Sequence, residues 1–190
     1  MTNVTLSNNQ APAGVGASAI MLAQPLFTTT VPTAYLNNVT ITGNGGAVTN
    51  VISAETANTI TFRNTIIADN NNANNCATVT GGSVGKSLGN SLNDDMTCTL
   101  DNATDFVNNS QAELAPLADN GGGTLTHALL VSSIAIDTGG ATTCEALDQR
   151  GFSRPIDGDD DTVAICDMGA FEYLSSEPST YTIFLPTILK

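Results

Sequence analysis

The stretch Asn38-Val39-Thr40-Ile41-Thr42-Gly43-Asn44 contains the pattern that decides the fold. It begins with Asn, continues through β-forming residues whose apolar members alternate, and closes in a polar turn with a second Asn. The pattern recurs as Asn3-Val4-Thr5-Leu6-Ser7-Asn8-Asn9 and as Asn64-Thr65-Ile66-Ile67-Ala68-Asp69-Asn70. Repeats starting at positions 3, 38 and 64 have the spacing expected of a solenoid whose turns carry loops of variable length.

A second short strand pattern precedes two of these repeats, as Ala34-Tyr35-Leu36-Asn37 and as Thr59-Ile60-Thr61-Phe62-Arg63. Strands of successive turns would stack in parallel about 4.8 Å apart and direct alternate apolar side chains into a narrow interior. Corners between them need left-handed backbone, which Asn tolerates, and stacked amides can hydrogen-bond from turn to turn. We therefore predict an all-β parallel solenoid with Asn38 and Asn64 at corners; a β-sandwich with Asn-rich hairpins is the alternative.

Composition narrows the function classes. Lys and Arg total 5 against 18 Asp and Glu, which gives a formal net charge of −13, so nucleic acid would be repelled. Residues 1–68 contain a single acid, Glu55, and the acids concentrate in the C-terminal part. No stretch reaches the roughly 18 apolar residues of a spanning helix, so no transmembrane segment is predicted.

Four cysteines form two equally spaced pairs, Cys76 with Cys98 and Cys144 with Cys166. Among the three possible connectivities we favour these local disulfides, each adding roughly 3 kcal/mol of stability. Four reduced thiols are the alternative, and zinc is disfavoured because no Cys-x-x-Cys occurs and His127 is the only histidine. Disulfides indicate an extracytoplasmic protein, yet the sequence opens without a signal peptide, so we expect further N-terminal coils to be missing from it.

The chain divides into three predicted parts. Residues 1–100 are expected to form β-helix coils, with the breaker-rich segment 10–33 looping out and the regular pattern fading between Asn70 and Asn93. Residues 101–175 are expected to form an irregular, disulfide-stapled tail packed on or capping the solenoid. Residues 176–190 are expected to be a linker followed by a short apolar segment that includes Phe184-Leu185-Pro186.

Several motifs of the tail occur in an order typical of one bacterial family. They are Leu114 to Leu130 (LAPLADNGGGTLTHALL), Ala135-Ile136-Asp137, Asp148-Gln149-Arg150-Gly151, Arg154-Pro155 and Cys166-Asp167-Met168-Gly169-Ala170-Phe171-Glu172-Tyr173. The chain, over roughly residues 30 to 175, resembles right-handed parallel β-helix surface proteins with a C-terminal choice-of-anchor Q region. This resemblance implies a secreted or cell-surface protein whose tail precedes an anchoring element. Val131-Ser132-Ser133-Ile134 departs from the family's usual Pro-Gly-Ser-Pro-like stretch.

The loop Asp157-Gly158-Asp159-Asp160-Asp161 is the candidate ligand site. Alternating carboxylates on a loop with Gly can converge on a hard cation, so Asp157, Asp159 and Asp161 are predicted Ca²⁺ ligands. The competing interpretation is a solvated acidic loop held by the Cys144–Cys166 bridge, since the downstream glutamate of an EF-hand is absent. Calcium is the only cofactor that the sequence suggests.

Other polar residues have structural explanations. His127 lies among leucines and lacks an evident nucleophile and orienting partner, which favours a packed position over catalysis. Arg150 and Arg154 lie near Asp148 and Asp157, and internal charge pairing accounts for them.

Together these observations predict a non-catalytic, extracellular or cell-surface structural or adhesive module whose polar Thr, Asn and Ser faces contact glycans or other cell-surface components. One alternative is the C-terminal part of a polysaccharide-active β-helix enzyme, although the coils before Asn70 offer only Glu55 and Asp69 as acids and Arg63 as a base. The other is a Ca²⁺-stabilised surface spacer.

Overall fold

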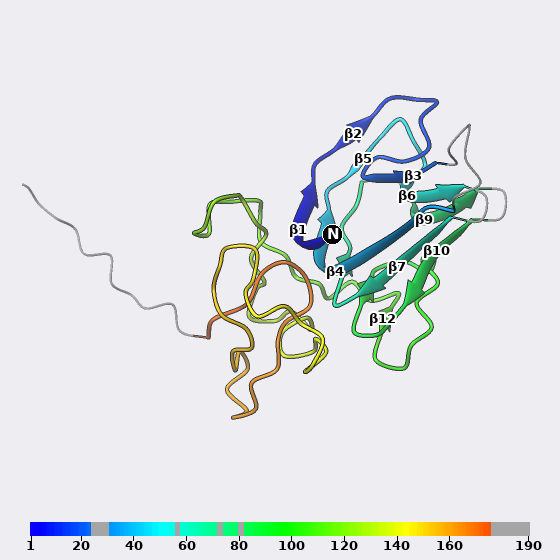
Figure 1. The fold of residues 1–190 in the computed structure, drawn as a ribbon. Coiled ribbons are helices and arrows are strands. Elements are labelled where there is room, and N and C mark those ends of the chain that lie inside the picture. Colours follow the sequence, from blue (N-terminus) through cyan, green and yellow to red (C-terminus); the bar gives the residue numbers. More distant parts are fainter. Residues whose placement is uncertain (24–30, 56–57, 72–73, 80–81, 176–190) are drawn as a thin grey trace, which may run out of the picture.

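The computed structural model describes residues 1–23, 31–55, 58–71, 74–79 and 82–175. These residues form an all-β structure with no helix, in which every pairing between named strands is parallel (Figure 1). The predicted all-β class and parallel stacking are therefore confirmed, and antiparallel hairpins of a β-sandwich are excluded for this region. The predicted linker and apolar segment at 176–190 lie outside the described residues.

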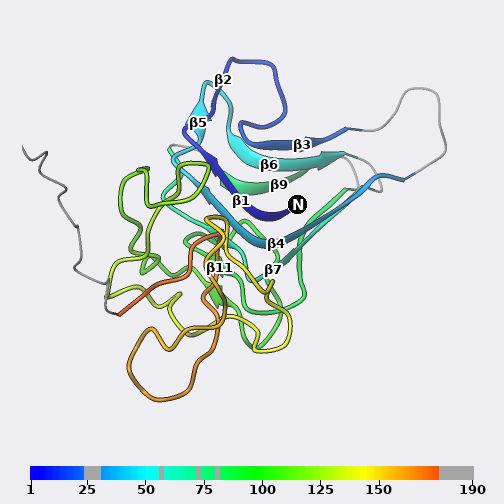
Figure 2. The same ribbon diagram turned by 60° about the vertical axis from the view of Figure 1, so that its left-hand side comes forward.

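Twelve strands follow one another along the coils in the described part of the chain. They are β1 (Thr2–Ser7), β2 (Gln10–Ala11), β3 (Ile20–Leu22), β4 (Thr33–Thr42), β5 (Gly45–Gly46), β6 (Asn50–Glu55), β7 (Thr59–Arg63), β8 (Ile66–Ile67), β9 (Asn74–Val79), β10 (Ser83–Ser87), β11 (Leu92–Asn93) and β12 (Phe106–Val107). The largest sheet has the order β10-β7-β4-β8-β11-β12, with β1 also on β4, while β3-β6-β9 and β2-β5 form the other sheets. The curled arrangement is visible in Figures 1 and 2. Strands β2 and β3 lie within the breaker-rich segment, and β10 to β12 continue past the point where the repeat fades.

Equivalent Asn residues occupy one corner of each turn. The backbone φ angle is 52° at Asn3, 53° at Asn38, 48° at Asn64 and 57° at Asn90. The strand registers place them one above another, because Val4 pairs with Val39, Thr40 with Ile66, and Ile66 with Leu92. The predicted corner positions of Asn38 and Asn64 are confirmed, and Asn90 extends the column into a turn whose sequence pattern is weak.

An amide ladder runs through the coils, but it lies at the other end of the repeat from these corners. The Nδ2 of Asn9 donates to Asn44 Oδ1 (2.8 Å), Asn44 to Asn70 (3.1 Å), Asn70 to Asn75 (2.9 Å) and Asn75 to Asn93 (2.6 Å). Asn44, Asn75 and Asn93 are buried, and each unsatisfied amide would cost about 1–3 kcal/mol. The closing Asn residues of the three repeats, Asn9, Asn44 and Asn70, thus begin this ladder, and at the corners Asn64 Nδ2 also donates to Asn37 Oδ1 (3.0 Å) of the preceding turn.

Two hydrophobic clusters organise the molecule. One fills the solenoid interior and comprises Ile20, Leu36, Val39, Ile41, Val51, Ile52, Ala54, Ile60, Phe62, Ile67, Cys76, Val84, Cys98 and Leu100. The other joins the outward side of the solenoid to the tail, where Ile66 and Leu92 pack with Leu129, Met168 and Phe171. Ile66 and Ile67 interrupt the alternation of apolar and polar residues along their strand. Both are apolar because the side chain of Ile67 faces the interior and that of Ile66 faces the tail.

The tail beyond β12 is irregular and lies against the side of the coils (Figure 2). Within it, isolated antiparallel bridges join Leu114 to Leu129 and Ala118 to Thr126. Disulfides join Cys76 to Cys98 and Cys144 to Cys166, the local pairing that the spacing favoured. Among the described residues no helix has the length and apolarity needed to cross a bilayer.

Candidate functional site

The corner Asn side chains bind the main chain of the tail. Each of the four makes at least one such hydrogen bond: Asn3 Nδ2 to Leu147 O (2.7 Å), Asn38 Nδ2 to Asp167 O (3.3 Å) and Gly169 O (3.4 Å), Asn64 Oδ1 from Gly140 N (2.8 Å), and Asn90 Nδ2 to Thr138 O (3.0 Å). Gly169 (φ 85°) packs closely against this column, since an added Cβ would lie 2.7 Å from Thr40 Oγ1. The corner column is therefore a docking ridge for the tail.

Arg154 and Glu172 form a buried ion pair directly behind this ridge. The guanidinium Nη1 lies 3.0 Å from Glu172 Oε2, and both side chains are 0% exposed. Arg154 also donates to the main-chain oxygens of Asp167 and Gly169, each at 2.9 Å, which are the oxygens that Asn38 binds from the other side. Internal charge pairing accounts for Arg154, as predicted, but its partner is Glu172 and not the nearby Asp157, because the chain folds back to place Glu172 beside it.

Arg150 occupies an aromatic sandwich beside Asp148. Its Nε lies 2.8 Å from Asp148 Oδ2, as predicted, and its guanidinium carbon lies 3.6 Å from the Phe171 ring centroid and 4.4 Å from that of Phe152. Asp148 also accepts hydrogen bonds from main-chain N–H groups, including that of Glu172. Both arginines of the tail are thus structural cations with no free face for a ligand.

Burial shifts the acid–base properties of this network. Desolvation, reinforced by the neighbouring Glu172 carboxylate, raises the pKa of Asp167 to about 8. Desolvation also raises the pKa of Glu172, against the opposing attraction of Arg154. The pKa of Arg154 is lowered by its burial, against the attraction of Glu172. More acids than bases are buried here, so the network holds protons more strongly than exposed carboxyls would.

His127 is a packed, hydrogen-bonded residue, as predicted. Its Nδ1 donates to Ala115 O (2.7 Å), because a carbonyl oxygen can only accept, and its Nε2 lies 2.7 Å from Ser7 Oγ and accepts from that hydroxyl in the neutral ring. Only 9% of the residue is exposed. The contact fixes strand β1 to the tail.

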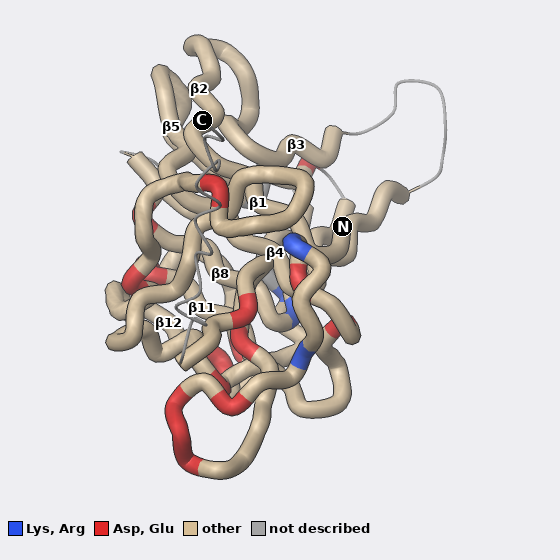
Figure 3. Tube along the Cα trace, turned by 90° about the vertical axis from the view of Figure 1, so that its left-hand side faces the viewer, with Lys and Arg blue, Asp and Glu red and all other residues tan. Residues whose placement is uncertain are grey.

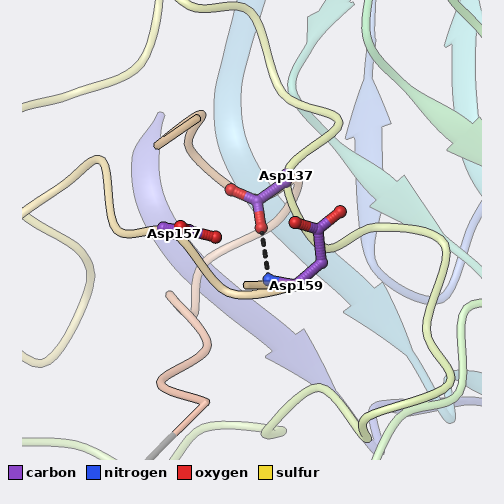
Figure 4. A group of neighbouring side chains, drawn as sticks. All are labelled: Asp137, Asp157 and Asp159. Atoms are coloured by element: carbon purple, nitrogen blue, oxygen red, sulfur yellow. Dashed lines mark hydrogen bonds between the residues drawn. The ribbon is translucent and has the colours of Figure 1, made fainter. Parts of the chain in front are cut away.

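Three carboxylates converge at the acidic loop, but the set differs from the predicted one. Asp137, Asp157 and Asp159 bring ligand oxygens within 4.8 Å of one another, and Figure 4 shows them around the loop. Asp161 is not in this group; its Oδ1 accepts Val163 N (2.7 Å). Asp137 was not among the predicted ligands, because it lies a long way from the loop along the chain and only the tail fold brings it there.

The surroundings of the Asp137, Asp157 and Asp159 carboxylates affect how well they could hold a cation. Desolvation raises the pKa of Asp137 despite hydrogen bonds from Ile165, Gly158 and Asp159 N–H groups, and the Asp159 charge raises it further. Asp157 Oδ1 is buried with no hydrogen-bond partner. Three carboxylates with one unsatisfied oxygen are oxygen donors of the kind that Ca²⁺ prefers, although exposed acidic groups often occur without an ion.

A second acidic pair links neighbouring coils. Asp94 Oδ2 accepts Asp69 N at 2.6 Å. The pKa of Asp69 is raised by burial first and then by the charges of Asp94 and Glu113, while His127 lowers it. Asp94 therefore adds a carboxylate beyond Glu55 and Asp69, the acids counted in the coils before Asn70.

The outward side of β4, β7 and β10 carries the unburied basic side chains of the described chain. Tyr35 pairs in register with Thr61, which pairs with Lys86, and Arg63 lies in the adjacent row with its guanidinium 5.9 Å from the Tyr35 ring centroid. Tyr35 is 40% exposed and Lys86 is exposed. Figure 3 shows acidic residues gathered in and around the tail, away from β2 and β5. We call Tyr35, Thr61, Arg63 and Lys86 the β7 face.

Comparisons of the chain with models of protein families, with curated proteins and with solved structures found no match in any of the three. The family resemblance drawn from the tail motifs therefore stays a prediction.

Proposed function

We propose that this chain is a non-catalytic extracellular or cell-surface module, a right-handed parallel β-helix with a choice-of-anchor Q type tail, which adheres to glycans. Its parallel stack supports the solenoid part of this proposal, and its two disulfides support an oxidising compartment. The tail motifs support the family assignment. Docking of the tail along the corner column supports a structural rather than a catalytic role for the tail.

The β7 face is the observation that carries the adhesive part. A protein of net charge −13 places an exposed tyrosine, a threonine and two cations on adjacent strands of one rigid sheet. Aromatic faces stack on sugar rings, and Arg binds carboxylates through two parallel hydrogen bonds. Arg63 is half-buried and its guanidinium carbon lies 5.9 Å from the Tyr35 ring centroid, so the cation and the aromatic ring form one surface.

A glycan array followed by affinity measurement tests this proposal. Tyr35→Ala and Arg63→Gln should each weaken binding of the best glycan at least about fivefold, which corresponds to roughly 1 kcal/mol. Met21→Ala is the matched control, since Met21 is 37% exposed on β3, in another sheet, and its truncation should leave binding unchanged. Binding of no glycan, or equal binding by all variants, would refute adhesion through this face.

The alternative of a polysaccharide-active enzyme has one supporting observation, the Asp69–Asp94 pair with the raised pKa of Asp69. Glycosidases use two carboxyl groups, of which the one that acts as the acid has a raised pKa. A reducing-sugar assay on acidic and neutral polysaccharides tests it. Release of sugar that Asp69→Asn abolishes would replace the adhesive proposal, whereas activity unchanged by that substitution would remove this pair from consideration.

Calcium stabilisation is the third candidate and concerns the Asp137, Asp157 and Asp159 triad. An ion bound only by the folded state raises stability, by about 2.7 kcal/mol at one hundred times the Kd. The melting temperature in 5 mM CaCl₂ should then exceed that in EDTA, and Asp137→Asn should remove the difference while Asp161→Asn, outside the triad, preserves it. Equal melting temperatures in Ca²⁺ and EDTA would end this candidate.

A further inference from the structure

A cavity of about 450 Å³ opens between the tail and β12, away from the β7 face. Its volume lies within the range of small-molecule sites in proteins. Phe106, Ile134, Ile136 and Tyr173 contribute apolar and aromatic surface, and Val131, which is 81% exposed, stands at its rim. Asp159 and Asp160 supply carboxylates to the wall, and no lysine, arginine or histidine lines it.

The serine and threonine hydroxyl groups of the wall have already used their hydrogens. Ser133 Oγ donates to Ala112 O, Thr138 Oγ1 donates to Ile134 O (2.7 Å), and Ser175 Oγ donates to Asp160 Oδ1 (3.1 Å). Each hydroxyl therefore offers the cavity only lone pairs, and the carboxylates are acceptors as well. Apart from the Tyr173 hydroxyl, which can donate as well as accept, the polar side chains of the cavity thus only accept hydrogen bonds.

We infer that this cavity binds an organic ammonium group carried on an apolar or aromatic body. An ammonium has three donors and no acceptor, which complements a wall made mostly of acceptors that include two carboxylates. Aspartates supply opposite charge, and the faces of Phe106 and Tyr173 attract cations. The ligand is either a free amine or a lysine side chain of a peptide, because both present this chemistry. This inference is independent of glycan adhesion by the β7 face.

Tryptamine and tryptophol are the probes, because they differ only in an ammonium in place of a hydroxyl. Titration of the full chain, followed by backbone amide NMR in EDTA and low salt, should show tryptamine binding at least about tenfold more tightly than tryptophol, with shifts at residues 131–138 and 158–160. About 0.5 M NaCl should remove most of this preference, since the carboxylates at the rim are exposed to screening. Equal affinities for the two probes would overturn the inference.

Two variant pairs locate the site. Val131→Lys places a competing ammonium at the rim and should weaken tryptamine binding at least fivefold, whereas Val15→Lys, an equal change at a 46% exposed residue of the first coil, should not.

Asp159→Asn with Asp160→Asn should abolish the preference over tryptophol, whereas Asp101→Asn with Asp119→Asn, the same change of net charge at exposed acids outside the lining, should preserve it. If both members of either pair lost binding, the change in net charge alone would explain the loss, and the inference would be overturned.

A capped Trp-Lys-Trp peptide distinguishes the two sources of the ligand. Tighter binding of the peptide than of tryptamine assigns the cavity to a lysine side chain, and the reverse assigns it to a free amine. Binding that appears only after removal of residues 176–190 would identify the chain's own C-terminal segment as the occupant and overturn the inference.

Discussion

Replacing Arg154 with Met tests whether the buried network holds the tail to the coils. The substitution keeps most of the apolar stem but leaves the Glu172 carboxylate, which is 0% exposed, without its cation. Breaking a buried ion pair in this way costs about 3–5 kcal/mol. Glu172 can avoid a buried, unpaired charge by taking up a proton, and this limits the loss of stability. From the ordinary pKa of 4.5, protonating the carboxylate costs about 3 kcal/mol at pH 7 and below 1 kcal/mol at pH 5.

We therefore expect Arg154→Met to lower the free energy of unfolding by about 3 kcal/mol at pH 7 and by much less at pH 5. Urea denaturation followed by circular dichroism measures this loss. Hydrogen exchange should show residues 135–173 losing protection while residues 36–67 of the coils keep it, because the solenoid has its own core. Adding Glu172→Gln should recover part of the loss, since no uncompensated charge then stays buried.

Lys86→Met is the matched control, because it removes a cation that is exposed and makes no buried pair. Its effect on stability should stay within about 0.5 kcal/mol. A loss below about 1 kcal/mol for Arg154→Met at pH 7, or an equal loss at pH 5, would refute the idea that pairing with Glu172 is what matters.

Three further predictions concern pH, the corners and the disulfides. Because the pKa of Asp167 in the folded state is about 8, far above its ordinary value of 3.8, the native state binds the extra proton, so the melting temperature should fall between pH 4.5 and pH 8. Asp167→Asn should flatten that slope, and a wild-type melting temperature that rises over this range would contradict the assignment. At Asn64, where φ is 48°, replacement by Ala should destabilise by about 1–2 kcal/mol more than replacement by Gly in urea unfolding, and equal losses would mean that backbone strain contributes nothing. Cys76→Ala with Cys98→Ala should lower the free energy of unfolding by roughly 3 kcal/mol in the same assay, and an unchanged midpoint would show that the bridge is dispensable.

Local signals predicted the coils well. An Asn that must adopt a left-handed backbone is visible in the sequence because it recurs at the head of each repeat, and the two-residue period of strand side chains identifies the interior. The ladder Asn9-Asn44-Asn70 could also have been predicted, since these residues end the same three repeats. Strands β10 and β11 escaped notice because Gly and Ser dilute the β-forming residues around them, and pairing to preformed neighbours supplies what local propensity does not.

Contacts made by the tail could not be predicted in the same way. Its chain has no period, so nothing local indicates that Asp137 meets the acidic loop or that Glu172 rather than Asp157 meets Arg154. The doublet Ile66-Ile67 was the available signal of the tail's position. Two adjacent apolar residues on a strand place one side chain on each face, and burying both requires a partner outside the solenoid.

The corner column explains how an irregular tail finds one place on a repetitive surface. Glycine would satisfy the left-handed backbone at these corners but offers no side chain, and Asp would offer acceptors only. The tail uses both functions of the amide: it presents carbonyls to Asn3, Asn38 and Asn90, and main-chain N–H groups to Asn38 and Asn64. If the tail slid by one coil, each corner Asn would meet the main-chain group that now binds its neighbour, and a tail carbonyl could lie against an amide oxygen unless that Asn side chain turned. Gly169 would also lose its close contact with Thr40 and Ile66. The register is therefore determined by tail chemistry matched to individual corners, while the corners themselves share one backbone geometry.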